Sequence, residues 1–268
     1  MRLEFSEKSI TKKYEVKFKE RVTAPNYEVE ENEFSVDISV RYHRDSAVLV
    51  ILSTLEEGDG VLEKILEIGN TIFDRVEYSL TEKGEPDTIL NLEEIIEKWN
   101  SLRKEKFFNM KTENEKEFIF KLSRMINSKG RFSEMLKRFN VVPYLFAGLY
   151  NQEIKKASPL RLKRKLYNVF PLMNIPIQYE VYDTSQKGSE ITYTIKEDEL
   201  FDRSEYTKQV LSCYPTEAEH KIGSFDLKGG GKYLFDEDNI VTMMTMDILI
   251  EIRNLVNYQC EYILKEQV

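Results

Sequence analysis

One segment, Val76–Leu102, constrains the fold most because it joins a strand to a helix through a short turn. Its first five residues alternate apolar and polar side chains, which predicts a strand with one buried face. Gly84 and Pro86 then supply turn chemistry that reverses the chain. Asn91 is a good helix N-cap, with Glu94 three residues later as its capping-box partner. The predicted helix buries residues at helical spacing: Leu92, Ile95, Ile96, Trp99 and Leu102.

Both ends of the chain show the period-two alternation of half-buried strands. Near the N-terminus it covers residues 10–22 and 34–42. After Ile175 it returns, and Lys187-Gly188 is the predicted turn of a hairpin. At the C-terminus residues 244–252 and 256–264 alternate in the same way. A helix over residues 247–257 is excluded because acidic and amide side chains would enter its apolar face, so we predict a terminal β-hairpin.

Shorter patterns give further expectations. Residues 59–73 have apolar positions at helical spacing, whereas residues 210–214 suit a short strand that ends at Pro215. In the middle of the chain, Thr112 and Glu115 form a capping box before a helix. That helix has apolar residues at helical spacing: Phe118, Ile119, Leu122, Met125 and Ile126. Two more helical stretches follow, one from Phe132 to Phe139 and one that begins at Pro143.

These patterns predict an α+β protein with curved antiparallel sheets from both ends of the chain, packed around a central helical layer. We expect one continuous fold over residues 1–268, because no low-complexity stretch or flexible linker divides the chain. Its parts would be β-rich at 1–91, helical at 92–170 and β-rich again at 171–268.

Composition indicates a folded chain, since 41% of the residues are apolar and 12% are aromatic. The charged start resembles no secretory signal, and no apolar run reaches the length of a membrane span. A removed signal peptide would leave no trace in such a sequence. From these features we predict a cytoplasmic protein without a membrane span.

The net charge of −8 conceals an uneven distribution. Residues 101–165 hold 17 Lys and Arg against 6 Glu, a net charge of +11, which leaves −19 for the rest. Within this part, residues 155–165 contain six basic side chains, and no acid occurs between Glu153 and Glu180. Two interpretations stay open: a solvated connection, or a site for phosphate or carboxylate groups. The candidate binding residues are Arg161, Lys163, Arg164 and Lys165.

No motif for catalysis or metal binding is found. The two histidines, His43 and His220, have no partners at metal-ligand spacing, so we expect no metal and no cofactor. Cys260 alternates with tyrosines and is predicted to be a small core residue, and Cys213 is far from it in sequence. Gly229-Gly230-Gly231-Lys232 lacks the spacing of a phosphate-binding loop, and we expect a hairpin loop there.

The favoured function is therefore a non-enzymatic interaction or adaptor protein that recognises another protein. An immunity-type inhibitor is one form, since an acidic surface suits a basic target. One alternative is a carrier that holds an apolar small molecule between curved sheet and helices. Another is an anion- or nucleic-acid-binding protein that uses residues 155–165. The sequence does not identify the partner, the biological process or the oligomeric state.

Overall fold

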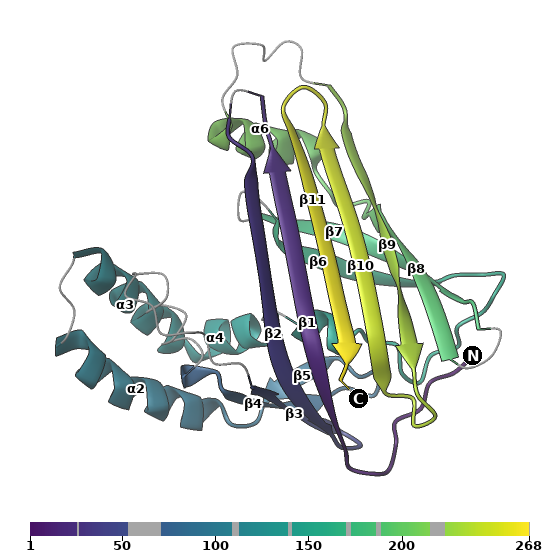
Figure 1. Ribbon diagram of the computed structural model, residues 1–268, viewed down its shortest axis with the longest axis horizontal. Helices are drawn as coiled ribbons and strands as arrows, with labels where there is room; N and C mark the ends of the chain where they lie inside the picture. Colours follow the sequence, from purple (N-terminus) through teal and green to yellow (C-terminus); the bar gives the residue numbers. More distant parts are fainter. Residues whose placement is uncertain are drawn as a thin grey trace. The chain divides into compact units, whose positions relative to one another are not determined.

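The computed structural model describes residues 1–25, 27–52, 71–108, 113–138, 141–169, 173–185, 189–214 and 223–267. The strands in this part of the chain are β1 (Ile10–Thr23), β2 (Glu30–Tyr42), β3 (Ser46–Ile51), β4 (Arg75–Leu80), β5 (Pro86–Ile89), β6 (Leu160–Val169), β7 (Met173–Asp183), β8 (Ser189–Glu197), β9 (Phe225–Phe235), β10 (Val241–Ile252) and β11 (Val256–Glu266). The helices are α2 (Leu92–Phe108), α3 (Glu113–Ile126), α4 (Lys129–Leu136), α5 (Val142–Leu145) and α6 (Arg203–Cys213) (Figure 1).

All these strands belong to one 11-stranded antiparallel sheet in the order β5-β4-β3-β2-β1-β11-β10-β9-β8-β7-β6. The α+β class is therefore right, but the predicted pair of sheets around a helical layer is wrong. The N-terminal and C-terminal strands meet edge to edge, because β1 lies beside β11. Local sequence patterns specify that a segment is a strand but not which distant strand it pairs with, so this junction was missed.

The chain forms two compact units. Unit 1 comprises residues 1–4, 15–35 and 152–266, and unit 2 comprises residues 5–14, 36–151 and 267–268. The long strands β1 and β2 contribute to both units, so neither unit is one continuous stretch of sequence. Helix α6 belongs to unit 1, and α2 to α5 belong to unit 2.

The sheet of unit 1 curves strongly. Tyr179 on β7 donates its hydroxyl to Met246 Sδ on β10 over 3.8 Å, although β8 and β9 lie between these strands in the sheet. Figure 1 agrees, because β6 and β7 lie behind β10 and β11. The concave face is filled with buried side chains, which include Tyr179, Tyr193, Tyr233, Tyr262, Met244 and Met246.

The glycine run at 229–231 lies inside β9, so the predicted hairpin loop is wrong. Tyr193 on β8 pairs with Gly231, crosses it, and donates its hydroxyl to the Thr245 carbonyl of β10 over 2.8 Å. A Cβ atom at Gly231 would collide with that carbonyl oxygen, and one at Gly229 would lie 2.8 Å from the carbonyl oxygen of Asp247. Glycine is needed here because neighbouring strands and an aromatic ring approach the backbone closely.

Unit 2 confirms the predicted strand–turn–helix segment. Strand β4 is followed by a turn with Gly84 at φ +82°, and α2 begins at Leu92. The expected cap differs: the Asn91 side chain accepts a hydrogen bond from the Glu77 amide over 2.9 Å and donates to the Arg75 carbonyl over 3.2 Å. It ties the start of α2 to β4 instead of capping the helix.

The other expectations have mixed outcomes. The terminal hairpin is confirmed, since β10 pairs with β11 from Met243–Lys265 to Ile252–Val256. The strand expected at 210–214 is wrong, because α6 extends to Cys213. Residues 160–169, which we expected in the helical middle, form β6. The predicted Lys187-Gly188 turn, most of the 59–73 helix and the Thr112 cap lie outside the described residues. None of the described helices is long and apolar enough to cross a membrane.

Candidate binding surface on the helices

The predicted basic segment places two of its cations beside buried carboxylates. Arg161 Nε lies 3.5 Å from Glu180 Oε1, and Lys196 Nζ lies 2.6 Å from Glu180 Oε2. Lys163 Nζ lies 3.7 Å from Asp198 Oδ2. The Glu180 and Asp198 side chains are only 8% and 5% exposed, and a buried carboxylate is costly without a cation nearby. These contacts favour a structural role for Arg161 and Lys163.

The other two predicted binding residues point to opposite faces of β6. Arg164 is half-buried on the apolar face, where its charge opposes the burial that raises the pKa of the Tyr179 hydroxyl. Lys165 is exposed on the same face as Arg161 and Lys163. The structure therefore does not bring all four residues together, since strand alternation separates Arg164 from the other three. Their role in binding stays a prediction.

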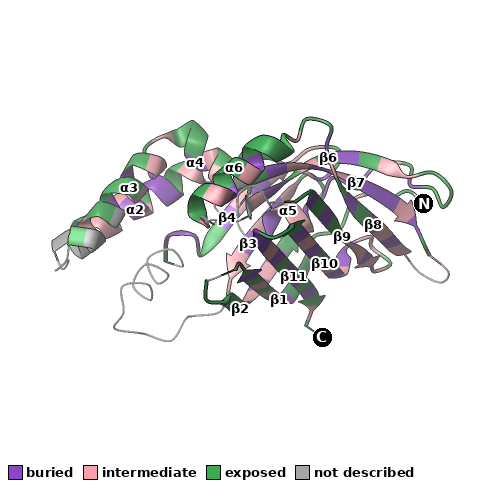
Figure 2. Cartoon of the chain, turned by 90° about the horizontal axis from the view of Figure 1, so that it is seen from above, coloured by how far each residue is buried: buried purple, intermediate pink, exposed green. Residues whose placement is uncertain are grey.

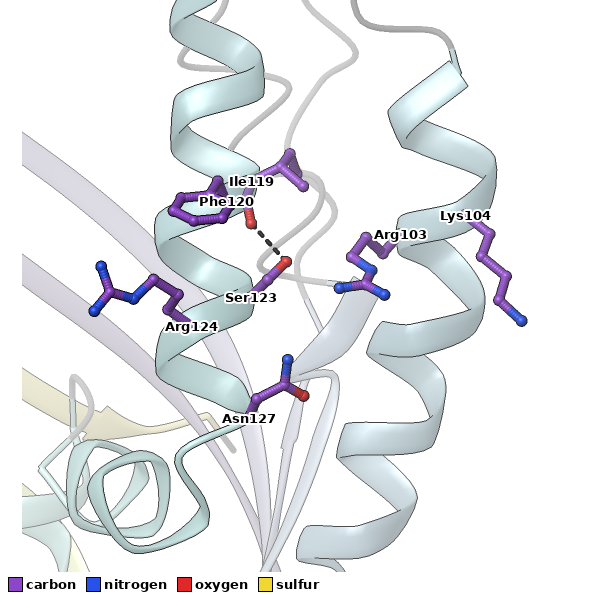
Figure 3. Close-up of a pocket in the computed structure, with 7 residues that line it drawn as sticks. All are labelled: Arg103, Lys104, Ile119, Phe120, Ser123, Arg124 and Asn127. Carbon is purple, nitrogen blue, oxygen red and sulfur yellow. Dashed lines mark hydrogen bonds between the residues drawn. The ribbon is translucent and has the colours of Figure 1, made fainter.

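A second candidate surface is a groove in unit 2, between α2 and α3. This groove has a volume of about 480 Å³, and it is lined by Arg103, Lys104, Ile119, Phe120, Ser123, Arg124 and Asn127 (Figure 3). Figure 3 shows Arg103 reaching from α2 toward the gap between the helices, with Ile119 and Asn127 facing it from α3. We call these seven residues the α2–α3 groove.

The apolar part of the groove includes one unusually exposed ring. Phe120 is 62% exposed, whereas Ile119 beside it is 2% exposed. Helical spacing explains the contrast, because Ile119, Ser123 and Ile126 form the buried stripe of α3 and Phe120 falls outside it. Figure 2 shows exposed, intermediate and buried positions along the α2 and α3 helices. Ser123 is satisfied internally, since its hydroxyl donates to the Ile119 carbonyl over 2.7 Å.

No carboxylate that the structure describes forms an ion pair with the cations of the groove. Arg103, Lys104 and Arg124 form no ion pair with any carboxylate in the described part of the chain, although other lysines on these helices do. Lys121 on α3, for example, pairs with Glu117 over 2.7 Å. Aromatic and arginine side chains are enriched at protein interfaces, so this surface is a candidate for binding a partner.

Sequence reasoning placed α3 correctly but missed the groove. The signal was present: the predicted apolar stripe of α3 left Phe120 on another face. The charge count also indicated the right region, since the groove lies within the basic span 101–165. The sequence does not show that α2 lies beside α3, and the groove forms only because these two helices are close together.

The cysteines and histidines form no reactive centre among the residues that the structure describes. Cys260 is buried on β11, and its burial raises the pKa of the thiol to about 12. Cys213 is exposed at the end of α6. No three metal-ligating side chains of the described residues cluster, and His220 lies outside this part of the chain. The expectation of a small core cysteine at 260 is thus confirmed.

Comparisons with known proteins add little to this geometry. No protein-family model and no curated protein matches the sequence. A solved structure of a LolA superfamily protein from Nitrosomonas europaea aligns with 99% of this chain and 89% of its own length, at 8% identity and a TM-score of 0.17. A TM-score this low does not establish a common fold.

Proposed function

We propose that this chain is a non-enzymatic interaction protein that binds a partner protein through the α2–α3 groove. The observation that carries the proposal is Phe120, a ring 62% exposed at a groove whose three cations have no described carboxylate partner. Aromatic and arginine side chains dominate the binding energy of protein interfaces. The groove lies between two helices, a setting that can take an amphipathic helix or an extended segment.

Charge complementarity defines the partner. The groove carries Arg103, Lys104 and Arg124, so the partner segment is acidic on the side that meets these residues. This reverses the expectation from the overall acidic composition, which suggested a basic target. An inhibitor of the immunity type remains one form of such a binder, with an acidic instead of a basic surface on its target.

The test is affinity capture from the source cells with the full-length tagged chain, comparing two single variants. Phe120→Ala removes the exposed ring of the groove. Leu200→Ala is the matched control, because Leu200 is 78% exposed and lies in unit 1. We expect Phe120→Ala to weaken a specific partner at least tenfold and Leu200→Ala to retain it, with both variants as stable as the wild type. Equal capture by both variants would contradict the proposal.

A carrier of an apolar small molecule is the second candidate, favoured by the volume of the groove. About 480 Å³ lies within the range of roughly 300–1,000 Å³ that small-molecule sites occupy. Such a carrier would show added mass above the 31.7 kDa chain in native mass spectrometry. The added mass would be lost in Phe120→Ala, and no protein partner would be needed.

A further inference from the structure

A second hollow lies on the other side of α3, between α3 and α4. It also has a volume of about 480 Å³, and it is lined by Lys121, Arg124, Met125, Ser128 and Arg131. Three of these five residues are cations, and the lining contains no acid. Arg124 is shared with the α2–α3 groove, whereas Lys121, Ser128 and Arg131 belong to this hollow alone.

Two of the three cations have no ion-pair partner among the described residues. Lys121 pairs with Glu117, but Arg124 and Arg131 have no ion pair with any carboxylate that the structure describes. Lys129, the first residue of α4, differs because it pairs with Glu93, which does not line the hollow. Two guanidinium groups that line one hollow are suited to an oxyanion, since each offers several N–H donors in a fixed plane.

A serine side chain also lines this hollow. Ser128 occupies the N-cap position of α4, but its side chain makes no capping hydrogen bond, and the first turn of α4 contains no acidic residue. A Cβ added at Gly130 would have no atom within 4 Å, so space beside this turn is open. Ser128 lines the hollow together with the two arginines, so its hydroxyl can donate to a ligand there.

We propose that the α3–α4 hollow binds a phosphoryl group, supplied either as inorganic phosphate or as a phosphate monoester. A tetrahedral dianion has enough oxygens to accept from Arg124, Arg131 and Ser128 together, and its charge balances the two unpaired guanidinium groups. A carboxylate carries one charge and two oxygens, so it leaves part of the hollow unsatisfied. The two sites share Arg124, but phosphate binding here requires no partner in the α2–α3 groove.

The test titrates the full-length chain with inorganic phosphate at constant ionic strength, using calorimetry and thermal unfolding. We expect saturable binding of one phosphate per chain and a higher unfolding temperature, with no such effect from chloride or acetate. Arg131→Gln and Arg124→Gln should each weaken phosphate at least tenfold. Lys129→Gln is the matched control on the same turn of α4 and should change the affinity less than twofold.

A parallel titration with O-phosphoserine separates the two sources of the phosphoryl group. Tighter binding of O-phosphoserine than of phosphate would identify a monoester as the ligand, and the reverse order would identify the free anion. Phe120→Ala should leave both affinities unchanged, so failure of the groove proposal does not affect this one. Absence of saturable phosphate binding, an equal response to acetate, or equal losses in Lys129→Gln and Arg131→Gln would overturn the site.

Discussion

Trp99 is the largest fully buried side chain of the described core, with no exposed surface. Replacing it with alanine should lower the free energy of unfolding by about 3–5 kcal/mol, because a buried aromatic leaves a cavity that its surroundings fill only in part. Chemical denaturation measures the change. Leu90→Ala is the control, since Leu90 is 56% exposed, and its substitution should cost less than about 1 kcal/mol. Similar losses in both variants would show that Trp99 is not a core residue.

The two cysteines should differ sharply in reactivity. Burial raises the pKa of the Cys260 thiol to about 12, so this group stays protonated and shielded at neutral pH, whereas Cys213 is exposed. The thiolate is the reactive form of cysteine. We expect a thiol reagent to label one site per folded chain at pH 7–8, none in Cys213→Ser, and two after unfolding. Fast labelling of folded Cys213→Ser would contradict the burial of Cys260.

Two glycine-to-alanine substitutions should change the stability of the protein in opposite directions. Gly231→Ala places a Cβ against the Thr245 carbonyl, under the Tyr193 ring, so it should destabilise the chain by more than about 1 kcal/mol. Gly130→Ala lies within α4 in open space, and alanine is favoured over glycine in helices by roughly 0.5–1 kcal/mol. Denaturation midpoints should therefore fall for the first variant and rise for the second. A rise for both would mean that β9 tolerates a side chain at this position.

Strand β6 forms one edge of the sheet, and its outer cations help to hold it in place. The sharpest test concerns Lys196 on β8, which is separated from β6 by β7 and whose Nζ lies 2.6 Å from the buried Glu180 carboxylate. Lys196→Met leaves that carboxylate with Arg161 alone and should cost about 1–3 kcal/mol of unfolding free energy. Lys165 is exposed on β6, so Lys165→Met should lower the free energy of unfolding by less than about 0.5 kcal/mol. Indistinguishable unfolding curves would show that these ion pairs contribute nothing to stability.

The position of β6 at the edge of the sheet also accounts for the many basic residues in this segment. Charged residues on an edge strand discourage pairing with other chains, and this requirement alone enriches β6 in lysine and arginine. Sequence cannot show that Glu180 and Asp198, which come later in the chain, lie opposite these cations. An acid-free stretch in sequence is thus not an acid-free surface.

Some elements could be predicted because their local pattern allows only one structure. The β10–β11 hairpin has a long strict alternation with a short turn, and its register follows from that turn. The strand prediction for residues 210–214 was wrong because five residues rich in apolar side chains fit a strand or a helix equally well. The deciding contacts lie upstream: Asp202 accepts from the Glu205 amide over 2.9 Å, and Tyr206 and Val210 are buried one turn apart.

For the whole molecule, sequence indicated the class of fold and the location of the positive charge, but not the arrangement. The pairing of β1 with β11 joins residues more than 230 positions apart, and no local pattern encodes it. The groove has the same origin, because Phe120 and Arg103 come from separate helices. Both features arise from tertiary packing, which periodicity and composition do not specify.

The central claim is that the α2–α3 groove, and not the basic edge strand, is the surface that meets the partner. Hydrogen–deuterium exchange of the full-length chain, with and without the captured partner, tests it most directly. Bound partner should slow amide exchange in α2 and α3, with β6 unchanged, because only the covered elements lose their local opening. Protection confined to residues 160–169, with α2 and α3 exchanging as in the free chain, would contradict the account and return the site to Arg161, Lys163, Arg164 and Lys165.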